Sequence, residues 1–174
     1  FDGDLAVIGF LDGQDGWLYL AQGNQQGFRV HRLSGQFVDQ HNQDLGGRYA
    51  DFGTHRIGEH CAILARDGLI EMVFTDERTW ALLGYRGPID EGGIIQIVDQ
   101  GPSGSRRRMG ASPAATRDQF GRMVVVYQDS TNNDLLLNLH TAAGWLASPL
   151  LVDGNGAIGY ANSIYMQNSQ ALIG

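Results

Sequence analysis

The sequence contains a single cysteine, Cys61, and no lysine, so that all 12 of its basic residues are arginine. A lone cysteine excludes any disulfide within the chain. Cys61 lies in the apolar segment HCAILAR, where we expect a buried and unreactive thiol rather than a nucleophile. The exclusive use of arginine is compatible with a GC-rich genome and is not taken as a functional signal.

Long hydrophobic runs are also missing. No stretch of about 18 apolar residues occurs, so no membrane-spanning helix is predicted. The first residues, FDGDLAVIGF, do not have the pattern of a signal peptide, although a mature secreted chain would look the same. Nineteen acidic residues give a formal charge of −7, which disfavours nucleic acid as the partner.

Glycine is abundant, with 25 residues in 174, and 43% of the chain is apolar. The length fits one domain with a core, and the glycine content is typical of short strands joined by tight turns. No segment shows a helical period over ten residues. We therefore predict an all-β fold.

Three segments share one pattern: a strand of about seven residues, an aromatic residue, one further residue, an aspartate, a turn and a second strand. They are LAVIGFLDGQDGWLYLA from Leu5, LIEMVFTDERTWALLGY from Leu69 and RMVVVYQDSTNNDLLLNL from Arg122. The turn aspartates are Asp12, Asp76 and Asp129. We interpret these turns as hairpin bends, because aspartate and asparagine hydrogen-bond nearby amides there.

A Val-Asp pair follows each hairpin and ends at Asp39, Asp99 and Asp153, which are 60 and then 54 residues apart. Each pair precedes a glycine-rich turn and another strand. The unit is thus four short strands over roughly 50–60 residues, which is typical of a β-propeller blade. We predict blades at about 1–39, 46–99 and 109–153, with 160–174 opening a further blade, which is slightly more than three blades. The first unit begins at its second strand, so the expected numbers of strands are three, four, four and about two.

Three blades do not close a ring, so a partial ring is expected, with unpaired strand edges and exposed apolar faces at its ends. In one alternative the chain is part of a larger propeller. In the other, the last two strands pair with the first three and partners supply further blades.

The segment VVVYQDSTNNDLLLNLHTAAGWLASPLLVDGNGAIGYANSI resembles the repeats of bacterial extracellular β-propeller proteins. The other two units keep the turn and strands but lose the Thr-Asn that follows Asp129. The resemblance implies a fold and an extracellular, cell-surface or periplasmic setting, and it carries over no catalytic residues. The residues that match the repeat are Tyr127, Asp129, Thr131, Asn132, Asp134, Leu135, Gly144, Trp145, Val152, Asp153, Gly159, Tyr160 and Ser163.

Metal binding was considered at the turn acids and in THRIGEHCA, which contains His55, Glu59 and His60. The oxygen-bearing residues differ among the three turns, and the histidine spacing fits one face of neither a strand nor a helix. The sequence therefore predicts no metal, no cofactor and no catalytic residue, and it leaves any binding residues unknown. We also expect SRRRMG (Arg106 to Arg108) to be a solvated basic loop.

Among the acids, only Glu71, in LIEMVF, interrupts an apolar strand. It is a candidate channel carboxylate, although a strand glutamate is more often found at a blade edge or paired with an arginine. Trp17 and Trp80 recur at the start of the second strand of their hairpins, and Trp145 follows such a strand, which indicates packing between blades.

The function expected from these features is that of a non-catalytic scaffold or recognition module of a secreted or cell-surface bacterial protein. It would bind other protein chains, or the rest of its own propeller, with a glycan as a further candidate. The alternative is a glycoside hydrolase or lyase that uses a channel carboxylate. The two differ in one feature, because hydrolysis requires a second acid close to the first.

Overall fold

The computed structural model describes residues 5–39, 41, 43–48, 57–88, 92–103, 107–156 and 159–174. The described residues are all-β, as predicted. They contain no helix, and so none that is long and apolar enough to cross a membrane.

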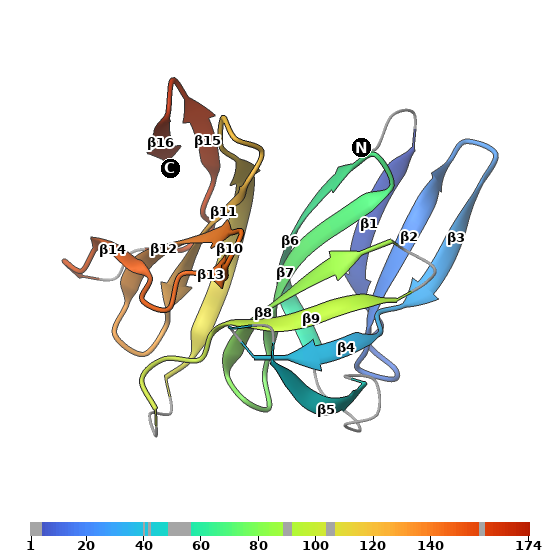
Figure 1. Ribbon diagram of the computed structural model, residues 1–174, viewed down its shortest axis with the longest axis horizontal. Helices are drawn as coiled ribbons and strands as arrows, with labels where there is room; N and C mark the ends of the chain where they lie inside the picture. Colours follow the sequence, from blue (N-terminus) through green and yellow to red (C-terminus); the bar gives the residue numbers. More distant parts are fainter. Residues whose placement is uncertain are drawn as a thin grey trace.

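The strands form four sheets, which Figure 1 shows side by side. The first sheet is antiparallel and has the order β1 (Ala6–Leu11), β2 (Leu18–Asn24), β3 (Gly27–Arg32). The second has the order β5 (Asp44–Arg48), β4 (Gly35–Val38), β9 (Gly93–Asp99), β8 (Ala81–Gly87), β7 (Leu69–Asp76), β6 (Ile57–Arg66). In the third, β10 (Met109–Arg117), β11 (Met123–Asp129) and β12 (Asp134–Thr141) are followed by β13 (Gly144–Trp145) and β14 (Leu150–Asp153), which both pair with β12. The fourth is the hairpin of β15 (Ile164–Gln167) and β16 (Gln170–Ile173).

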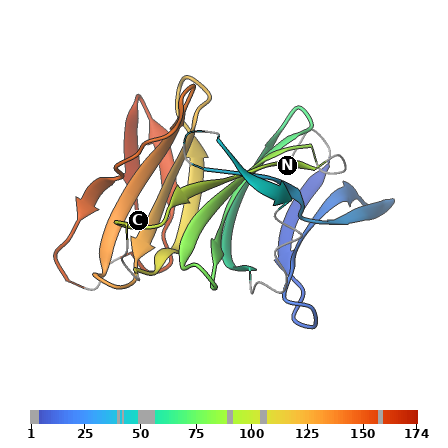
Figure 2. The same ribbon diagram turned by 60° about the horizontal axis from the view of Figure 1, so that its bottom comes forward.

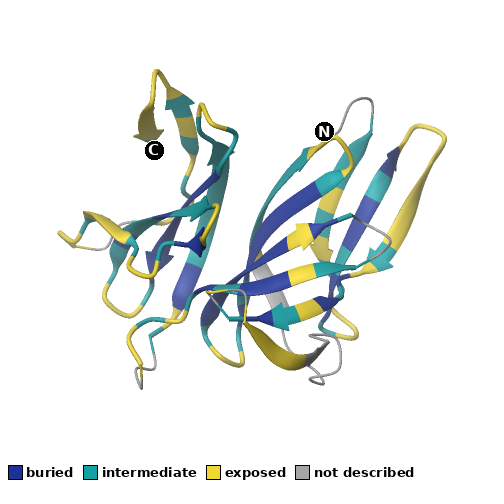
Figure 3. Cartoon of the chain, viewed as in Figure 1, coloured by how far each residue is buried: buried dark blue, intermediate teal, exposed yellow. Residues whose placement is uncertain are grey.

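Two hydrophobic cores hold the first three sheets together. Leu18 and Leu20 of β2 pack with Met72 and Phe74 of β7 in the first core, which lies between the first and second sheets. Val73, on the opposite face of β7, belongs to the second core, between the second and third sheets. A central strand covered on both faces needs a continuous apolar run, and this is why LIEMVF lacks polar alternation. Figure 3 shows the buried residues concentrated in these central strands.

Each sheet contacts the next one through its first or outermost strand, and the sheets stack in the order of the chain. β6 lies against β1 and also against β10, and β10 in turn contacts β15 (Figure 2). The described residues form no closed ring, so the predicted propeller is not established by the fold.

The sheets have three, six, five and two strands, so the first and last have the expected numbers and the two between them have more than the expected four. The last strand expected for unit 1–39, β4, lies in the second sheet and pairs in parallel with β9. The physical reason is that β3 already occupies the free edge of β2, through the hairpin at Asn24 to Gly27. The backbone groups of β4 must then find partners on another sheet.

Candidate functional site

Glu71 is buried at the centre of β7, with 5% of its surface exposed. Its Oε1 atom lies 3.4 Å from Nε of Arg86, the residue that faces it across the β7–β8 pair. Its Oε2 atom forms an ion pair with Nη1 of Arg117, from β10 of the third sheet. A buried carboxylate is tolerated when it is paired in this way, and the pairing also links two sheets. Of the arrangements considered for Glu71, the structure shows pairing with arginine.

A cavity of about 280 Å³ adjoins this cluster, between the second and third sheets. The second sheet contributes Glu71, Arg86 and the buried amide of Gln96. The third sheet contributes His140 and Trp145, whose rings meet edge to face with centroids 5.1 Å apart. The remaining lining is mostly apolar or small: Gly84, Tyr85, Ile94, Met123, Thr141, Ala142 and Gly144. We call this space the inter-sheet cavity.

The charge at the inter-sheet cavity is set by Arg86, which lines it, and by Arg117, which pairs with the lining residue Glu71. Burial lowers the pKa of His140, and the positive charge of Arg86 lowers it further, while Glu71 opposes both. The imidazole is therefore neutral at pH 7, so it can donate and accept a hydrogen bond. Two guanidinium groups then face one carboxylate, which leaves a net positive charge beside the cavity.

This geometry bears on the hydrolase alternative. Glycoside hydrolysis needs a pair of carboxyl groups about 5–10 Å apart. Among the described residues that line the inter-sheet cavity, Glu71 is the only acid, and both of its oxygens contact arginine. The residue on which the hydrolase alternative depends therefore has no second acid beside it among the described residues of the cavity lining.

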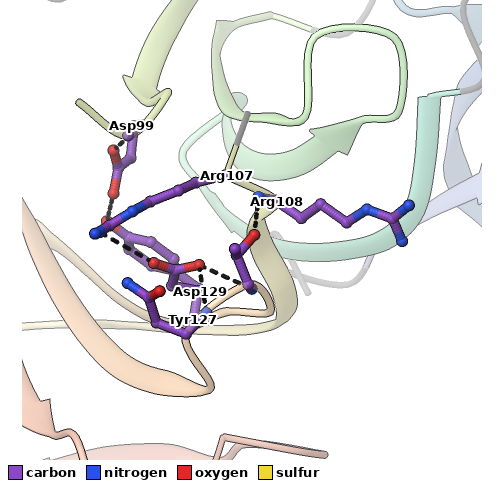
Figure 4. A network of polar contacts seen from close by, with 8 residues as sticks. Asp99, Arg107, Arg108, Tyr127 and Asp129 are labelled. Atoms are coloured by element: carbon purple, nitrogen blue, oxygen red, sulfur yellow. Dashed lines mark hydrogen bonds and ion pairs between the residues drawn. The ribbon is translucent and has the colours of Figure 1, made fainter. Parts of the chain in front are cut away.

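A second polar cluster connects the second and third sheets (Figure 4). The hydroxyl of Tyr127 donates to Oδ2 of Asp99 at 2.6 Å, and Nη1 of Arg107 lies 3.3 Å from Oδ2 of Asp129. Burial raises the pKa of Asp99, although the bonds from Tyr127 and the Gly101 amide lower it. Burial and the charge of Asp99 also raise the pKa of Tyr127. The Tyr127–Asp99 bond joins the second sheet to the third, and the Arg107–Asp129 pair ties the segment before β10 to the end of β11, so both contacts have a structural role.

The turn aspartates cap their own turns. A carboxylate oxygen of Asp12, Asp76 or Asp129 accepts the backbone N–H two residues later, at 2.7, 2.9 and 2.9 Å. The N–H four residues later donates to the aspartate carbonyl at 2.8, 2.7 and 2.7 Å. That fourth residue has a positive φ in each turn, and it is Gly16, Trp80 or Asn133. The bond pattern matches the hairpin-bend interpretation of the sequence.

The three tryptophans do not occupy one shared position. Trp80 takes the positive-φ position of its turn and is half-buried, whereas the matching residue in the first turn is Gly16, and Trp17 lies between Gly16 and β2. Trp17 belongs to the first core and Trp145 to the second. The predicted equivalence of Trp17 and Trp80 is therefore wrong by one residue, because the turns share their hydrogen bonds rather than their aromatic residues.

The basic loop is less solvated than expected. Arg107 pairs with Asp129, and the guanidinium of Arg108 stacks on Trp80 with its Cζ atom 4.0 Å from the ring centroid. Arg106 lies outside the described residues. In THRIGEHCA, His55 and the side chain of Glu59 are likewise undescribed, while His60 is exposed. Within the described part of the chain, no group of three or more histidine, cysteine or acidic residues is placed to hold a metal ion.

A second, wider cavity of about 560 Å³ lies where the adjacent strands β1, β6 and β10 meet. Its lining includes Phe10, His60, Cys61, Ser112 and Asn162. The Asn162 amide donates to the carbonyl of Ser112 at 2.8 Å, which ties β10 to the segment before β15. Burial raises the pKa of Cys61, as expected for an unreactive thiol.

Sequence reasoning identified Glu71 but missed its partners Arg86 and Arg117, and also His140. The sequence marks this position as unusual, because Glu71 stands three residues before the aromatic Phe74, where the other two hairpins have Val7 and Val124.

Comparison with known proteins does not identify a family: no family model matches the sequence, and no curated protein matches it either.

Proposed function

We propose that this chain is a non-catalytic scaffold or recognition module, built as a partial β-propeller in a secreted or cell-surface bacterial protein. Its sheets are successive blades. Its partners are other protein chains or the remainder of its own propeller, with a glycan as a further ligand. The secreted and bacterial setting is supported by the resemblance of residues 124–164 to extracellular propeller repeats.

The stacking of the sheets supports the blade interpretation. β7 and β11 are each buried on both faces, which is the environment of a blade strand covered by its neighbours. The shared hydrogen bonds and positive φ of the three aspartate turns support a repeated unit. A repeat of this kind buries its apolar faces only against another copy.

The observation that carries the proposal is that apolar side chains are exposed on both end sheets. In the first sheet, the cross-strand pairs Ile8–Ala21 and Ala21–Val30 put Ile8 and Val30 on the face opposite Leu20. Ile8 is 45% exposed and Val30 is 53% exposed. We call this the first end face, which consists of Ile8, Phe10, Phe28 and Val30.

At the other end, Tyr165 and Leu172 face each other across β15 and β16 and are 65% and 51% exposed. Met166 and Ala171, on the opposite face of this hairpin, line a cavity shared with Val124 of the third sheet. Tyr165 and Leu172 therefore point away from the stack and form the second end face. Exposed apolar patches of this kind mark interaction surfaces.

Sedimentation velocity tests the proposal. The wild-type chain should associate increasingly as its concentration rises, because the two end faces are the unpaired halves of the same kind of sheet-to-sheet contact. The double variant Ile8→Asp/Val30→Asp should weaken this association about tenfold or more. Leu45→Asp is the matched control, since Leu45 is also 45% exposed but lies on β5, away from both end faces.

Two results would contradict the proposal. One is a wild-type chain that stays monomeric at high concentration and binds no apolar dye. The other is equal association of the double variant and the Leu45→Asp control.

A further inference from the structure

We propose that the inter-sheet cavity binds a small sugar acid, with the ligand carboxylate on Arg86 and the ligand hydroxyls on Gln96 and His140. This inference rests on the recognition part of the proposed function and names a ligand class and a site for it.

The charged cluster departs from the pattern of the fold. The cross-strand pair Glu71–Arg86 is matched in the first sheet by Val7–Gln22 and in the third by Val124–Leu139. Neither of these two pairs contains a charged residue, so the fold does not require a charged pair at this position of the hairpin. Burying a charge costs stability unless it is paired, and departures from the local rule of a fold concentrate at functional sites.

The net charge selects an anion. Glu71 is shared between Arg86 and Arg117, and the cavity lining adds no second acid among the described residues. The side chain of Arg86 is 55% exposed and lines the cavity, so its outer nitrogens can reach a ligand. Guanidinium groups bind carboxylates well because they donate two parallel hydrogen bonds. An amino-acid ligand fits less well, because its ammonium group would need a carboxylate that is not already paired.

The remaining lining suits a sugar ring. Gln96 and the neutral His140 can both donate and accept hydrogen bonds, as hydroxyl groups require. Tyr85, Ile94 and Met123 supply an apolar surface for the C–H face of the ring. A cavity of about 280 Å³ lies just below the usual range of about 300–1,000 Å³ for small-ligand sites, which fits one monosaccharide rather than a chain.

Isothermal titration with D-galacturonate tests the inference, with D-galactose and acetate as the neutral and the minimal anionic probes. Galacturonate should bind, and each of the other two should bind at least about tenfold more weakly. Arg86→Gln should weaken galacturonate binding about tenfold or more. The control is Arg66→Gln, since Arg66 is exposed and pairs only with its neighbour Asp67 among the ion pairs described.

A second variant protects the test from a folding defect. Ile94→Trp keeps every charge and acts at a residue that is 44% exposed on the cavity lining, so it should block the ligand while the chain stays folded. No binding of galacturonate, equal binding of galactose or acetate, or unchanged binding by both variants would each overturn the inference. The association of the end faces is measured separately, so a failure here is distinguishable from a failure of the proposed function.

Discussion

Tyr127 and Asp99 join two sheets through one short hydrogen bond of 2.6 Å between the phenol hydroxyl and the carboxylate. Tyr127 is fully buried in β11, and Asp99 ends β9 of the preceding sheet. Between the first and second units this bond cannot form, because Phe74 stands where the tyrosine would be. Asp39 instead accepts the backbone N–H groups of His41 and Gln43, both at 2.8 Å.

Tyr127→Phe should lower the free energy of unfolding by about 1–3 kcal/mol, because Oδ2 of the half-buried Asp99 loses its donor and only Oδ1 keeps one, the Gly101 amide. Urea unfolding followed by fluorescence measures the change. Tyr19→Phe is the matched control, since Tyr19 also donates to an aspartate, Asp15, at 2.6 Å but in an exposed setting. A loss for Tyr127→Phe no larger than that of Tyr19→Phe would show that the inter-sheet bond adds nothing.

The sequence predicted what is decided locally. The turns at Asp12, Asp76 and Asp129 follow from side chains that bond to amides two residues away, so a short window contains all the relevant information. The parallel pairing of β4 with β9 joins strands far apart in the sequence and depends on which sheet edge is free. A local pattern cannot show this.

The candidate site divides in the same way. Glu71 is visible in the sequence as a charge within an apolar strand, but the ion pair with Arg117 exists only because the second and third sheets pack together. Arg66 ends β6 as Arg117 ends β10, and each is followed by an aspartate, but Arg66 pairs with its exposed neighbour Asp67. The two Arg-Asp sequences therefore look alike, and only the tertiary packing gives their arginines different partners.

His140 should make stability depend on pH. Its pKa in the folded chain is lowered, mainly by burial, from an ordinary value of 6.5. At a pH between the lowered pKa of the folded chain and the ordinary pKa of the unfolded chain, the unfolded chain binds more protons than the folded one. The free energy of unfolding therefore falls as the pH falls below about 6.5. Urea unfolding from pH 8 to pH 5 measures this slope.

His140→Phe keeps a ring against Trp145 and should reduce the acid-side loss of stability. Above about pH 7.5 the wild type and the variant should show parallel pH dependence, because the imidazole is then neutral in both folded and unfolded chains. An unchanged slope below pH 6.5 in the variant would refute the assignment to His140.

Gly110 lets the third sheet approach the second. Its φ is +88°, and a Cβ atom placed there would lie 2.7 Å from Cδ1 of Leu82. Gly121 has a similar φ of +77° but open space around it. Gly121→Ala should therefore cost about 1–2 kcal/mol from backbone strain alone. Gly110→Ala should cost about 1–3 kcal/mol more, because the added methyl group also overpacks the core. Equal losses in thermal unfolding would indicate that Leu82 moves aside freely.

Cys61 should react slowly with thiol reagents in the folded chain. Burial raises its pKa, so less thiolate is present at neutral pH than for a free cysteine, and the thiolate is the reactive form. The side chain is half-buried and packs against the first core, which also limits access. With a chromogenic disulfide at pH 7.5, we expect slow labelling of the native chain and a marked increase in rate in urea. Native labelling as fast as in urea would mean that the thiol beside the wider cavity is accessible and activated, contrary to the inert role expected from its apolar surroundings.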